Sequence, residues 1–316
     1  MMEKHAKIYV AGHKGLVGSA IVRHLQQNGY ENLLLRTSRE LDLREIKAVE
    51  AFFAAERPEY VFMAAAKVGG INANMTYPAE FLYDNLMIQN AVISACTNNR
   101  VRKLCFLGSS CIYPKECPQP MKEEYLMTGP LEPTNEGYAL AKIAGLKLVK
   151  YHCQQYGLKA VCPMPCNIYG PGDSFDLSKS HVLSALVKRF VDACEAGLNE
   201  VTLWSSGIAR REFLYVDDLA RAVLFLMNSH NSPDIINVGS GSDISIKELA
   251  EMTAAKTGFS GQIKWDVSKP DGMLRKCLDV SKITRLGFFP KTTLSEGIDQ
   301  VIYEYHQLYS QSLKLS

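Results

Sequence analysis

Short apolar runs alternate with longer amphipathic segments along the first half of the chain. The apolar runs have the length of buried strands, and they lie at residues 7–11, 32–35, 60–63, 103–107 and 159–162. The segments between most of them carry the apolar spacing of helices. This alternation predicts an α/β fold with a Rossmann-type, doubly wound parallel sheet, whose ligands bind at the carboxyl ends of the strands.

The helical segments can be bounded from their end signals. We expect helices over residues 19–28, 43–56, 78–98 and 135–156. Pro78 suits the first turn of a helix, and Asn135 is a plausible N-cap. Residues 64–77 carry glycines and predict a loop.

The alternation becomes irregular after Pro163. Residues 163–180 are crowded with Pro, Gly, Asp and Ser, so they predict a long loop of the kind that is often functional. His181 opens the next helix. The further elements that we expect are a strand after residues 210–213, a helix from residue 216, a strand at 235–238 and a helix at 294–308. We therefore expect a dinucleotide-binding domain over 1–165 and a smaller α/β domain over 166–316, with some segments of the latter returning to the former.

A glycine-rich turn follows the first predicted strand and precedes the first predicted helix. It reads Gly12-His13-Lys14-Gly15-Leu16-Val17-Gly18. In a dinucleotide-binding unit, the first glycine permits the tight turn and the second lets the pyrophosphate approach. The third lets the helix pack on the strand. The helix N-terminus then faces the phosphates. A glycine turn without a ligand is the alternative, and the strand–turn–helix context favours the nucleotide.

The end of the second predicted strand indicates which nucleotide is bound. An acidic residue here would favour NAD through the ribose hydroxyls, whereas arginine accommodates a 2′-phosphate. Arg36 and Arg39 flank Ser38 with no carboxylate between them, and this predicts NADP(H). Asp42 follows, where it could meet the adenine amino group. The alternative is that both arginines are merely solvated.

Candidate catalytic groups lie between Leu104 and Lys142. The fourth predicted strand ends in Gly108-Ser109-Ser110, and Tyr138 and Lys142 are four residues apart on one helical face. A nearby ammonium favours the ionised phenol, so Tyr138 could exchange a proton with an alkoxide while Ser109 holds the same oxygen. Because Tyr-x-x-x-Lys also occurs by chance, its meaning depends on the rest of the chain.

Composition narrows the class of protein. The 316 residues carry a formal net charge of +2 and no long basic run, so nothing indicates a nucleic-acid partner. No apolar stretch approaches a membrane span, and the N-terminus shows no signal-peptide segment. The nine cysteines form no Cys-x-x-Cys pair. We therefore expect reduced thiols, a cytoplasmic location and no metal site.

Together these residues resemble the extended short-chain dehydrogenase/reductase family. The shared features are the glycine motif, Ser109 at the end of the fourth strand, and the Tyr138/Lys142 pair. Within that family the chain is most similar to NADPH-dependent epimerase/reductases that act on GDP-4-keto sugars. The similar segments span nearly the whole chain, at residues 11–18, 64–71, 107–114, 131–135, 167–171, 211–213 and 269–272.

The resemblance implies a 3,5-epimerisation and 4-reduction of GDP-4-keto-6-deoxy-D-mannose. It assigns the reduction to Ser109, Tyr138 and Lys142, and the epimerisation to Cys111 as base and His181 as acid. The residues implied at the cofactor are Gly12, His13, Lys14, Gly15, Leu16, Val17, Gly18, Arg36, Ser38, Arg39, Asp42, Leu107, Gly108, Ser109, Ser110, Lys142, Pro165, Cys166, Asn167, Ile168 and His181. Those implied at the GDP-sugar are Arg189, Trp204, Arg211 and Asp271.

Other interpretations stay open from the residues. Without the resemblance, Cys111 reads as a small buried hydrophobe and His181 as a helix cap. Ser38 departs from the arginine that the family places at the 2′-phosphate, a role that Lys14, Arg36 or Arg39 could take. The substrate could be a related GDP-4-keto sugar, such as a 3,6-dideoxyhexose or a 6-deoxyheptose. A plain 4-epimerase or 4-reductase and a non-catalytic NADP sensor are the remaining rivals.

A homodimer is also expected from the resemblance. Related enzymes pair the helices that begin at Pro78 and Asn135 across a four-helix interface. The apolar side chains expected to supply the area are Phe81, Leu82, Ile93, Leu146 and Leu148.

Overall fold

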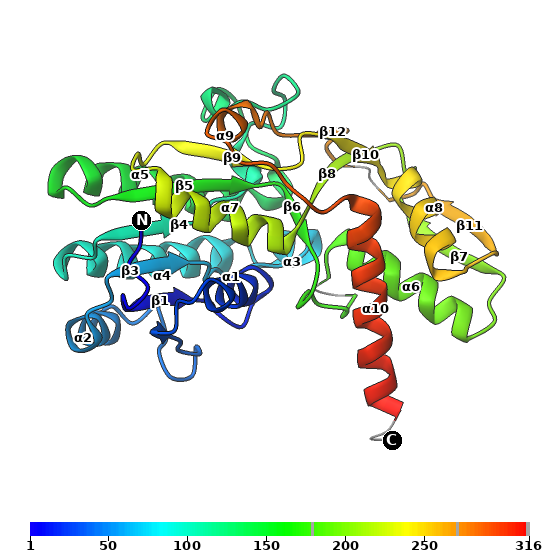
Figure 1. The fold of residues 1–316 in the computed structure, drawn as a ribbon. Coiled ribbons are helices and arrows are strands. Elements are labelled where there is room, and N and C mark those ends of the chain that lie inside the picture. Colours follow the sequence, from blue (N-terminus) through cyan, green and yellow to red (C-terminus); the bar gives the residue numbers. More distant parts are fainter. Residues whose placement is uncertain (178–179, 270–271, 314–316) are drawn as a thin grey trace.

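A parallel six-stranded sheet forms the centre of the larger part of the molecule (Figure 1). The computed structural model describes residues 1–177, 180–269 and 272–313. The strand order is β2-β1-β3-β4-β5-β9, and every neighbouring pair is parallel. The strands are β1 (Ile8–Ala11), β2 (Leu33–Leu34), β3 (Tyr60–Met63), β4 (Lys103–Phe106), β5 (Ala160–Pro165) and β9 (Ile235–Val238). The predicted Rossmann-type α/β sheet is confirmed.

Helices cover both faces of this sheet (Figure 1). α1 packs against α7, and α4 packs against both α2 and α5. Their bounds are α1 (Leu16–Gln27), α2 (Ile46–Glu56), α4 (Pro78–Asn98), α5 (Glu136–Tyr156) and α7 (Val216–Ser229). The fully buried apolar runs of β1, β3 and β4 explain why the sequence shows continuous rather than alternating hydrophobicity there.

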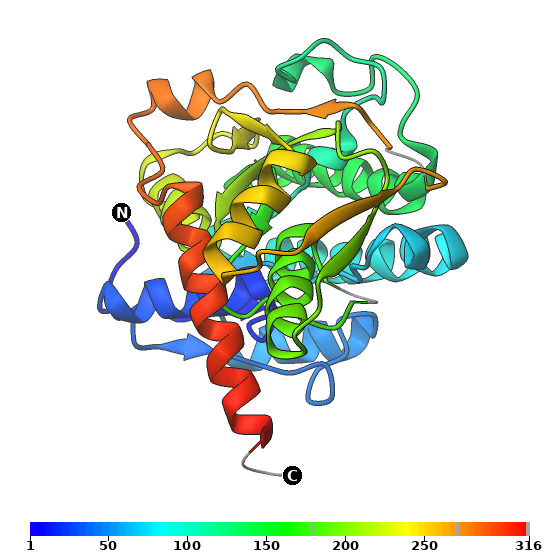
Figure 2. The same cartoon turned by 90° about the vertical axis from the view of Figure 1, so that its right-hand side faces the viewer.

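A smaller part of the molecule has a core of its own (Figure 2). It contains the helices α6 (Val182–Glu195), α8 (Ile246–Thr257) and α10 (Leu294–Leu313), and the paired strands β7 (Glu200–Trp204) and β11 (Gln262–Asp266). β9, α7 and the short helix α9 (Ser281–Arg285) pack with the large sheet instead. A division of the chain into domains near residue 165 stays a prediction.

The expected loop at residues 64–77 is wrong in its second half. Residues Ile71–Thr76 form a short helix, α3. Asn74 is buried there, and its amide donates to the carbonyl oxygens of Gly69 and Gly70 at 2.8 and 3.0 Å. This side-chain contact ties the turn of helix to the glycines before it, and periodicity over six residues does not reveal it.

The expected loop at residues 163–180 also begins later than predicted. β5 continues to Pro165, and β6 (Asn167–Tyr169) follows it. On the side of β5 that faces β4, the Pro163 carbonyl accepts from the N–H of Gly108, which follows the end of β4. The paired residues of β4 and β5 end at Cys105 and Val161, before Pro163. A proline, which has no N–H to donate, is therefore tolerated at this position of the strand.

Residues 210–213 form a strand rather than precede one. β8 (Arg210–Tyr215) pairs with β6, with β10 (Asp243–Ser245) and with β12 (Arg275–Lys276). Its charged side chains are compensated: Arg210 pairs with Asp243 at 2.5 Å, and the buried Glu212 carboxylate accepts from the backbone N–H groups of Gly241 and Leu278 at 2.6 and 2.8 Å. Because the strand begins with charged residues, it does not appear as a hydrophobic run in the sequence.

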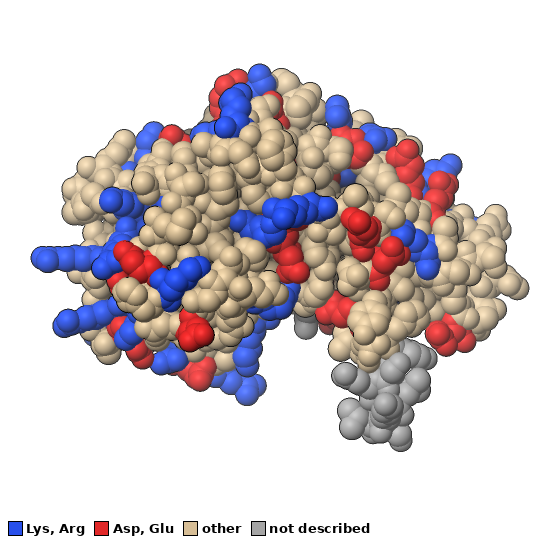
Figure 3. Space-filling view, viewed as in Figure 1, with Lys and Arg blue, Asp and Glu red and all other residues tan. Residues whose placement is uncertain are grey.

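Lys and Arg side chains are interspersed with Asp and Glu on the face drawn in Figure 3. Among the described residues, no helix has both the length and the apolar content needed to cross a bilayer.

Candidate active site

The glycine turn after β1 forms a tight cradle at the N-terminus of α1. Gly12 has a φ of +83°, and a Cβ there would lie 2.7 Å from the Ala65 nitrogen. A Cβ on Gly18 would lie 2.1 Å from the Gly12 oxygen, whereas Gly15 is exposed and faces open space apart from one ordinary contact. The N-terminus of α1 has no side-chain cap. Its free N–H groups and the open backbone at Gly15 suit a pyrophosphate, so the turn fits a dinucleotide.

The cationic side chains near the loop after β2 differ in whether they are already paired with a carboxylate. The Arg36 guanidinium pairs with Glu56 at 3.0 Å and lies 5.5 Å from the centre of the Phe52 ring. Arg39, Ser38 and Lys14 are exposed. Arg39 and Lys14 are therefore the cations of this region that a phosphate could reach without breaking an ion pair.

Of two further predicted nucleotide contacts, Asp42 is paired within the chain and His13 is not fully paired. Arg44 holds the Asp42 carboxylate through Nε at 3.0 Å and Nη2 at 2.7 Å. His13 lies half-buried on the turn, and its Nδ1 is buried without a hydrogen-bond partner among the described residues. An orphaned polar atom inside the cradle is consistent with a site that is completed by a ligand.

Ser109, Tyr138 and Lys142 come together at the carboxyl end of β4. The Ser109 side chain lowers the pKa of the Tyr138 phenol, and the Lys142 ammonium lies 5.7 Å from the centre of the Tyr138 ring. Lys142 is buried and donates to the Leu107 carbonyl at 2.8 Å. α5 and the end of β4 thus supply the hydroxyl, phenol and ammonium that the sequence predicts.

Burial dominates the protonation of this group. Burial raises the pKa of Tyr138, the Cys111 thiol raises it further, and the hydrogen bond from Ser109 lowers it. Burial lowers the pKa of Lys142 to about 8, against the nearby Cys111, which raises it. The phenol is therefore held protonated, as a proton donor to a forming alkoxide requires.

Cys111 lies in the same cluster, on the short 3₁₀ helix η1 (Ser110–Ile112) after β4. It is buried, and its backbone N–H donates to the Ser109 hydroxyl at 3.4 Å. Burial raises the pKa of the thiol. The Lys276 ammonium, a side-chain hydrogen bond with Ser109 and the Lys142 ammonium each lower it. Two cations thus favour the thiolate against the cost of burying it.

Lys276 is a residue of this site that sequence reasoning missed. It lies on β12 opposite Arg211 of β8. Burial lowers the pKa of Lys276, the nearby Cys111 raises it, and the Arg211 charge lowers it. The basic pair Arg275-Lys276, which follows the 269–272 segment after two further residues, was the available signal, but only the pairing of β12 with β8 brings Lys276 to Cys111.

His181 lies apart from this cluster, at the N-cap position of α6. Its Nδ1 is 2.9 Å from the Asp173 carboxylate, and Ser184 donates to the other oxygen of that carboxylate at 2.6 Å. No hydrogen bond among the described residues joins His181 to Ser109, Cys111, Tyr138 or Lys142. Asp173 and Ser184 were not among the predicted residues.

The remaining predicted cofactor residues line the carboxyl edge of the sheet. Leu107, Gly108 and Ser110 follow β4, and a Cβ on Gly108 would lie 2.2 Å from the Met164 sulfur. The residues Pro165, Cys166, Asn167 and Ile168 form the junction of β5 and β6. There the Cys166 N–H donates to the Val238 carbonyl at 3.1 Å. The Asn167 side-chain amide donates to the backbone carbonyl of Glu212 at 2.7 Å.

The predicted GDP-sugar residues lie on the smaller part. Arg189 is on α6, and the exposed Trp204 ends β7 with the Lys269 ammonium 5.8 Å from its ring centre. Arg211 is on β8 and donates to the Arg210 carbonyl at 2.8 Å. Asp271 lies outside the described residues. Within those residues, no cluster of three or more His, Cys, Asp and Glu side chains could hold a metal ion.

The chain is similar to known proteins over its whole length. The model of the NAD dependent epimerase/dehydratase family matches residues 8–239. "Putative GDP-L-fucose synthase 2" from Arabidopsis thaliana is 54% identical over 306 residues, which cover 97% of this chain and 93% of the relative. "GDP-L-colitose synthase" from Yersinia pseudotuberculosis is 40% identical, with 93% of this chain and 96% of the relative covered.

A solved structure shows the same fold. A GDP-D-glycero-L-gluco-heptose synthase from Campylobacter jejuni, determined in the presence of NADPH, superposes with a TM-score of 0.88. It is 37% identical, and the match covers 97% of this chain and 99% of that one.

Proposed function

The chain belongs to the NAD dependent epimerase/dehydratase family, and we propose that it converts GDP-4-keto-6-deoxy-D-mannose into GDP-L-fucose with NADPH. The reaction combines epimerisation at C3 and C5 with reduction at C4. The 54% identity to a fucose synthase, against 40% to a colitose synthase, favours this substrate over the dideoxy and heptose alternatives.

The observation that carries the proposal is the position of Cys111. Its backbone N–H donates to the Ser109 hydroxyl at 3.4 Å, and the Ser109 side chain lowers the pKa of both the Cys111 thiol and the Tyr138 phenol. A reduction at C4 alone has no use for a thiol at this point. A buried thiol beside the reducing group, with Lys276 and Lys142 to favour its thiolate, is what removal of a proton next to the C4 ketone requires.

The proposed reaction divides between two sets of groups. The C4 ketone acidifies the C–H bonds at C3 and C5. The Cys111 thiolate takes a proton from the carbon, and His181 returns one to the opposite face. In the reduction, Tyr138 gives its proton to the C4 oxygen, Ser109 holds that oxygen, and the Lys142 cation stabilises the phenolate that remains. The bound cofactor supplies the reducing electron pair, and the Gly12–Gly18 turn would hold its pyrophosphate.

The test is a product analysis. The protein is incubated with NADPH and, in separate reactions, with GDP-4-keto-6-deoxy-D-mannose, its 3-deoxy analogue and a GDP-4-keto-6-deoxyheptose. NMR of each product gives the configuration at C3, C4 and C5. Formation of GDP-L-fucose at the highest kcat/KM is expected. Reduction without inversion at C3 and C5 would identify a plain 4-reductase instead.

We expect a preference for NADPH over NADH of at least about tenfold in kcat/KM, since a charge-assisted bond is worth on the order of 2 kcal/mol. The 2′-phosphate would meet Arg39 and Lys14, because Arg36 is already paired with Glu56. Arg39→Ala should lower the NADPH/NADH ratio, and Arg285→Ala on α9 is the control. Equal kcat/KM values for the two cofactors in the unaltered enzyme would refute the preference.

The proposed homodimer uses the outer faces of α4 and α5, but with different residues from those expected. Phe81, Ile93 and Leu146 are buried inside the chain's own core, at 3%, 0% and 4% exposure, so the prediction that they supply an interface is wrong. Leu82 and Leu148 are half-buried. The large exposed apolar side chains on these helices are Tyr83, Leu140, Tyr151 and Tyr156.

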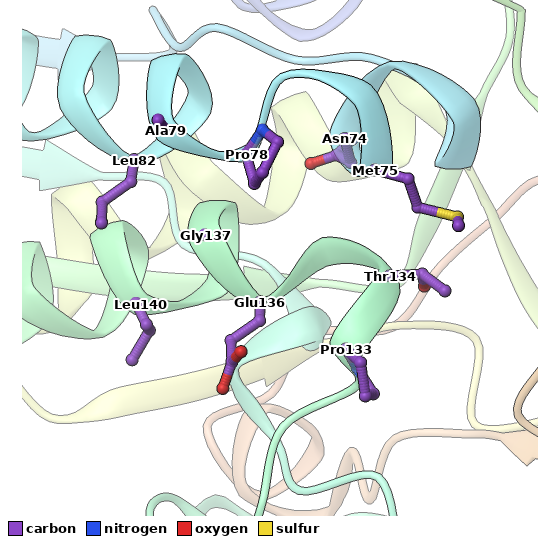
Figure 4. A pocket seen from close by; sticks show the side chains of 10 residues that line it. All are labelled: Asn74, Met75, Pro78, Ala79, Leu82, Pro133, Thr134, Glu136, Gly137 and Leu140. Carbon is purple, nitrogen blue, oxygen red and sulfur yellow. The ribbon is translucent and has the colours of Figure 1, made fainter.

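A pocket of about 550 Å³ opens between the end of α3 and the first turns of α4 and α5 (Figure 4). Gly137 lets the two long helices approach there, because a Cβ would lie 2.7 Å from the Pro78 oxygen. Met75, Leu82 and Leu140 line the pocket. A second copy of the chain would cover these apolar groups, which supports the dimer.

Light scattering is expected to give twice the 35.2 kDa mass of one chain. Leu140→Arg should shift the mass towards the monomer by placing a charge in the interface, while Leu198→Arg, on the smaller part, should leave it unchanged. A monomer mass for the unaltered protein at working concentration would end the idea.

We also propose that the enzyme works in the cytoplasm. All nine cysteines are free thiols, and a catalytic thiol at Cys111 needs a reducing compartment.

A further inference from the structure

Asp173 forms a preorganised pair with His181. The loop that follows β6 turns at Gly170 and Gly172, whose φ values are +135° and +93°. This turn carries Asp173 to the first turn of α6. One carboxylate oxygen is 2.9 Å from His181 Nδ1, and the other accepts from Ser184 at 2.6 Å. The Asp173 side chain is only 4% exposed, whereas that of His181 is 56% exposed.

We propose that Asp173 is a positioning residue that makes His181 the acid of the epimerisation. It accepts a hydrogen bond from Nδ1–H, so that Nε2 is the nitrogen left to meet the substrate, and its charge stabilises the imidazolium. Ser184, which is fully buried, fixes the carboxylate in turn. The inference rests on the proposed function, because it names how one group of that site is held.

The surroundings of His181 would otherwise disfavour its positive charge. It stands at the N-terminus of a fourteen-residue helix, whose dipole opposes a cation. The hydrogen bond with Asp173 raises the pKa of His181, burial lowers it, and the Asp173 charge raises it again. Among the described residues of other elements, Glu304 on α10 accepts from the Gly172 N–H at 2.9 Å, and Arg23 on α1 interacts with Glu304. Asp176 is a further charged group on the loop itself.

The proton balance requires this tautomer. When the imidazolium gives its Nε2 proton to the substrate carbon, the neutral ring that remains carries its proton on Nδ1. That is the proton that Asp173 accepts, so the bond persists through the step. Cys111 has meanwhile become a thiol by taking the proton from the opposite face. Both groups return to their starting forms by exchanging one proton with solvent.

The experiment compares Asp173→Asn, Ser184→Ala and the control Asp176→Asn, which makes the same change three residues further along the loop. Nitrogen-15 NMR of the ligand-free protein gives the tautomer and pKa of His181, with His181→Asn used to assign its signals. Asp173→Asn keeps the shape of the side chain and removes its charge. We expect it to lower the His181 pKa by about one to two units. Asp176→Asn should leave the His181 pKa unchanged.

The second measurement is solvent-deuterium exchange into C3 and C5 of GDP-4-keto-6-deoxy-D-mannose as a function of pH. An acid works only while protonated, and the Cys111 thiolate fraction is common to all variants, so the ratio of the variant's rate to that of the unaltered enzyme reports the protonated fraction of His181. For Asp173→Asn we expect a loss of roughly ten- to a hundredfold at pH 8 and much less at pH 6. Ser184→Ala should give a loss with the same pH dependence but a smaller size.

The outcomes separate cleanly. An unchanged His181 pKa and tautomer in Asp173→Asn would overturn the proposal, as would a changed pKa with an unchanged exchange profile. A uniform loss of exchange at every pH, together with a lower melting temperature, would show a merely structural role. If the unaltered enzyme exchanges no deuterium, the proposed function has failed, while the NMR titration still decides whether Asp173 holds His181.

Discussion

Tyr138→Phe is expected to abolish reduction of the C4 ketone while proton exchange at C3 and C5 continues. The phenol is the proton donor at the forming alkoxide, and phenylalanine removes that proton without changing the packing of the ring. General-acid groups contribute roughly 10²- to 10⁴-fold. NADPH consumption should fall by at least that much, and NMR in heavy water should still show deuterium entering both carbons, because Cys111 and His181 are untouched.

The matched control for this variant is Tyr303→Phe, which removes an exposed phenol from α10 and should leave both activities unchanged. Tyr138→Phe removes only one hydroxyl, so it should cost on the order of 1 kcal/mol of stability, far less than is needed to unfold the protein. Loss of deuterium exchange together with reduction would mean that one group serves both steps, contrary to the division proposed here.

The sheet could be predicted because its strands are buried on both faces. A continuous apolar run such as Tyr60–Met63 has one interpretation once helices flank it, and the strand has those bounds. β8 could not be found in this way. Its first residues are charged. Arg210 pairs with Asp243 of β10, and Glu212 accepts from backbone N–H groups just before β10 and just after β12, none of which is close in sequence.

The site divides in a similar way. Ser109, Cys111, Tyr138 and Lys142 belong to two local motifs, and the packing of α5 on the end of β4 brings them together. Lys276 and Asp173 belong to no motif. Each enters through a long-range placement, the pairing of β12 with β8 for Lys276 and the turn after β6 for Asp173. Arg36 was predicted at the nucleotide from its place at a strand end, but it is paired with Glu56, twenty residues away, and the sequence near Arg36 does not reveal that pairing.

Cys111→Ser is expected to slow deuterium exchange at C3 and C5 by at least about 10²-fold, while the fold and cofactor binding persist. The thiol, with an ordinary pKa of about 8.5, is replaced by a hydroxyl that is far harder to ionise. Lys276 and Lys142, which lower the pKa of the thiol, cannot offset that difference. Burial raises the thiol pKa, so the thiolate is the minor form at neutral pH. In the unaltered enzyme exchange should therefore rise with pH while His181 is protonated, and level off as His181 loses its proton.

The reducing groups are intact in this variant, so slow direct reduction of the unepimerised ketone should yield a product with the starting configuration at C3 and C5. Cys117→Ser, six residues along the same segment and half-buried, is the control for replacing sulfur by oxygen. If Cys111 serves only for packing, the opposite result is expected: the buried hydroxyl of Cys111→Ser would lower the melting temperature modestly and leave deuterium exchange intact. Normal exchange in Cys111→Ser would thus remove the base, and with it the reason to distinguish this enzyme from a plain 4-reductase.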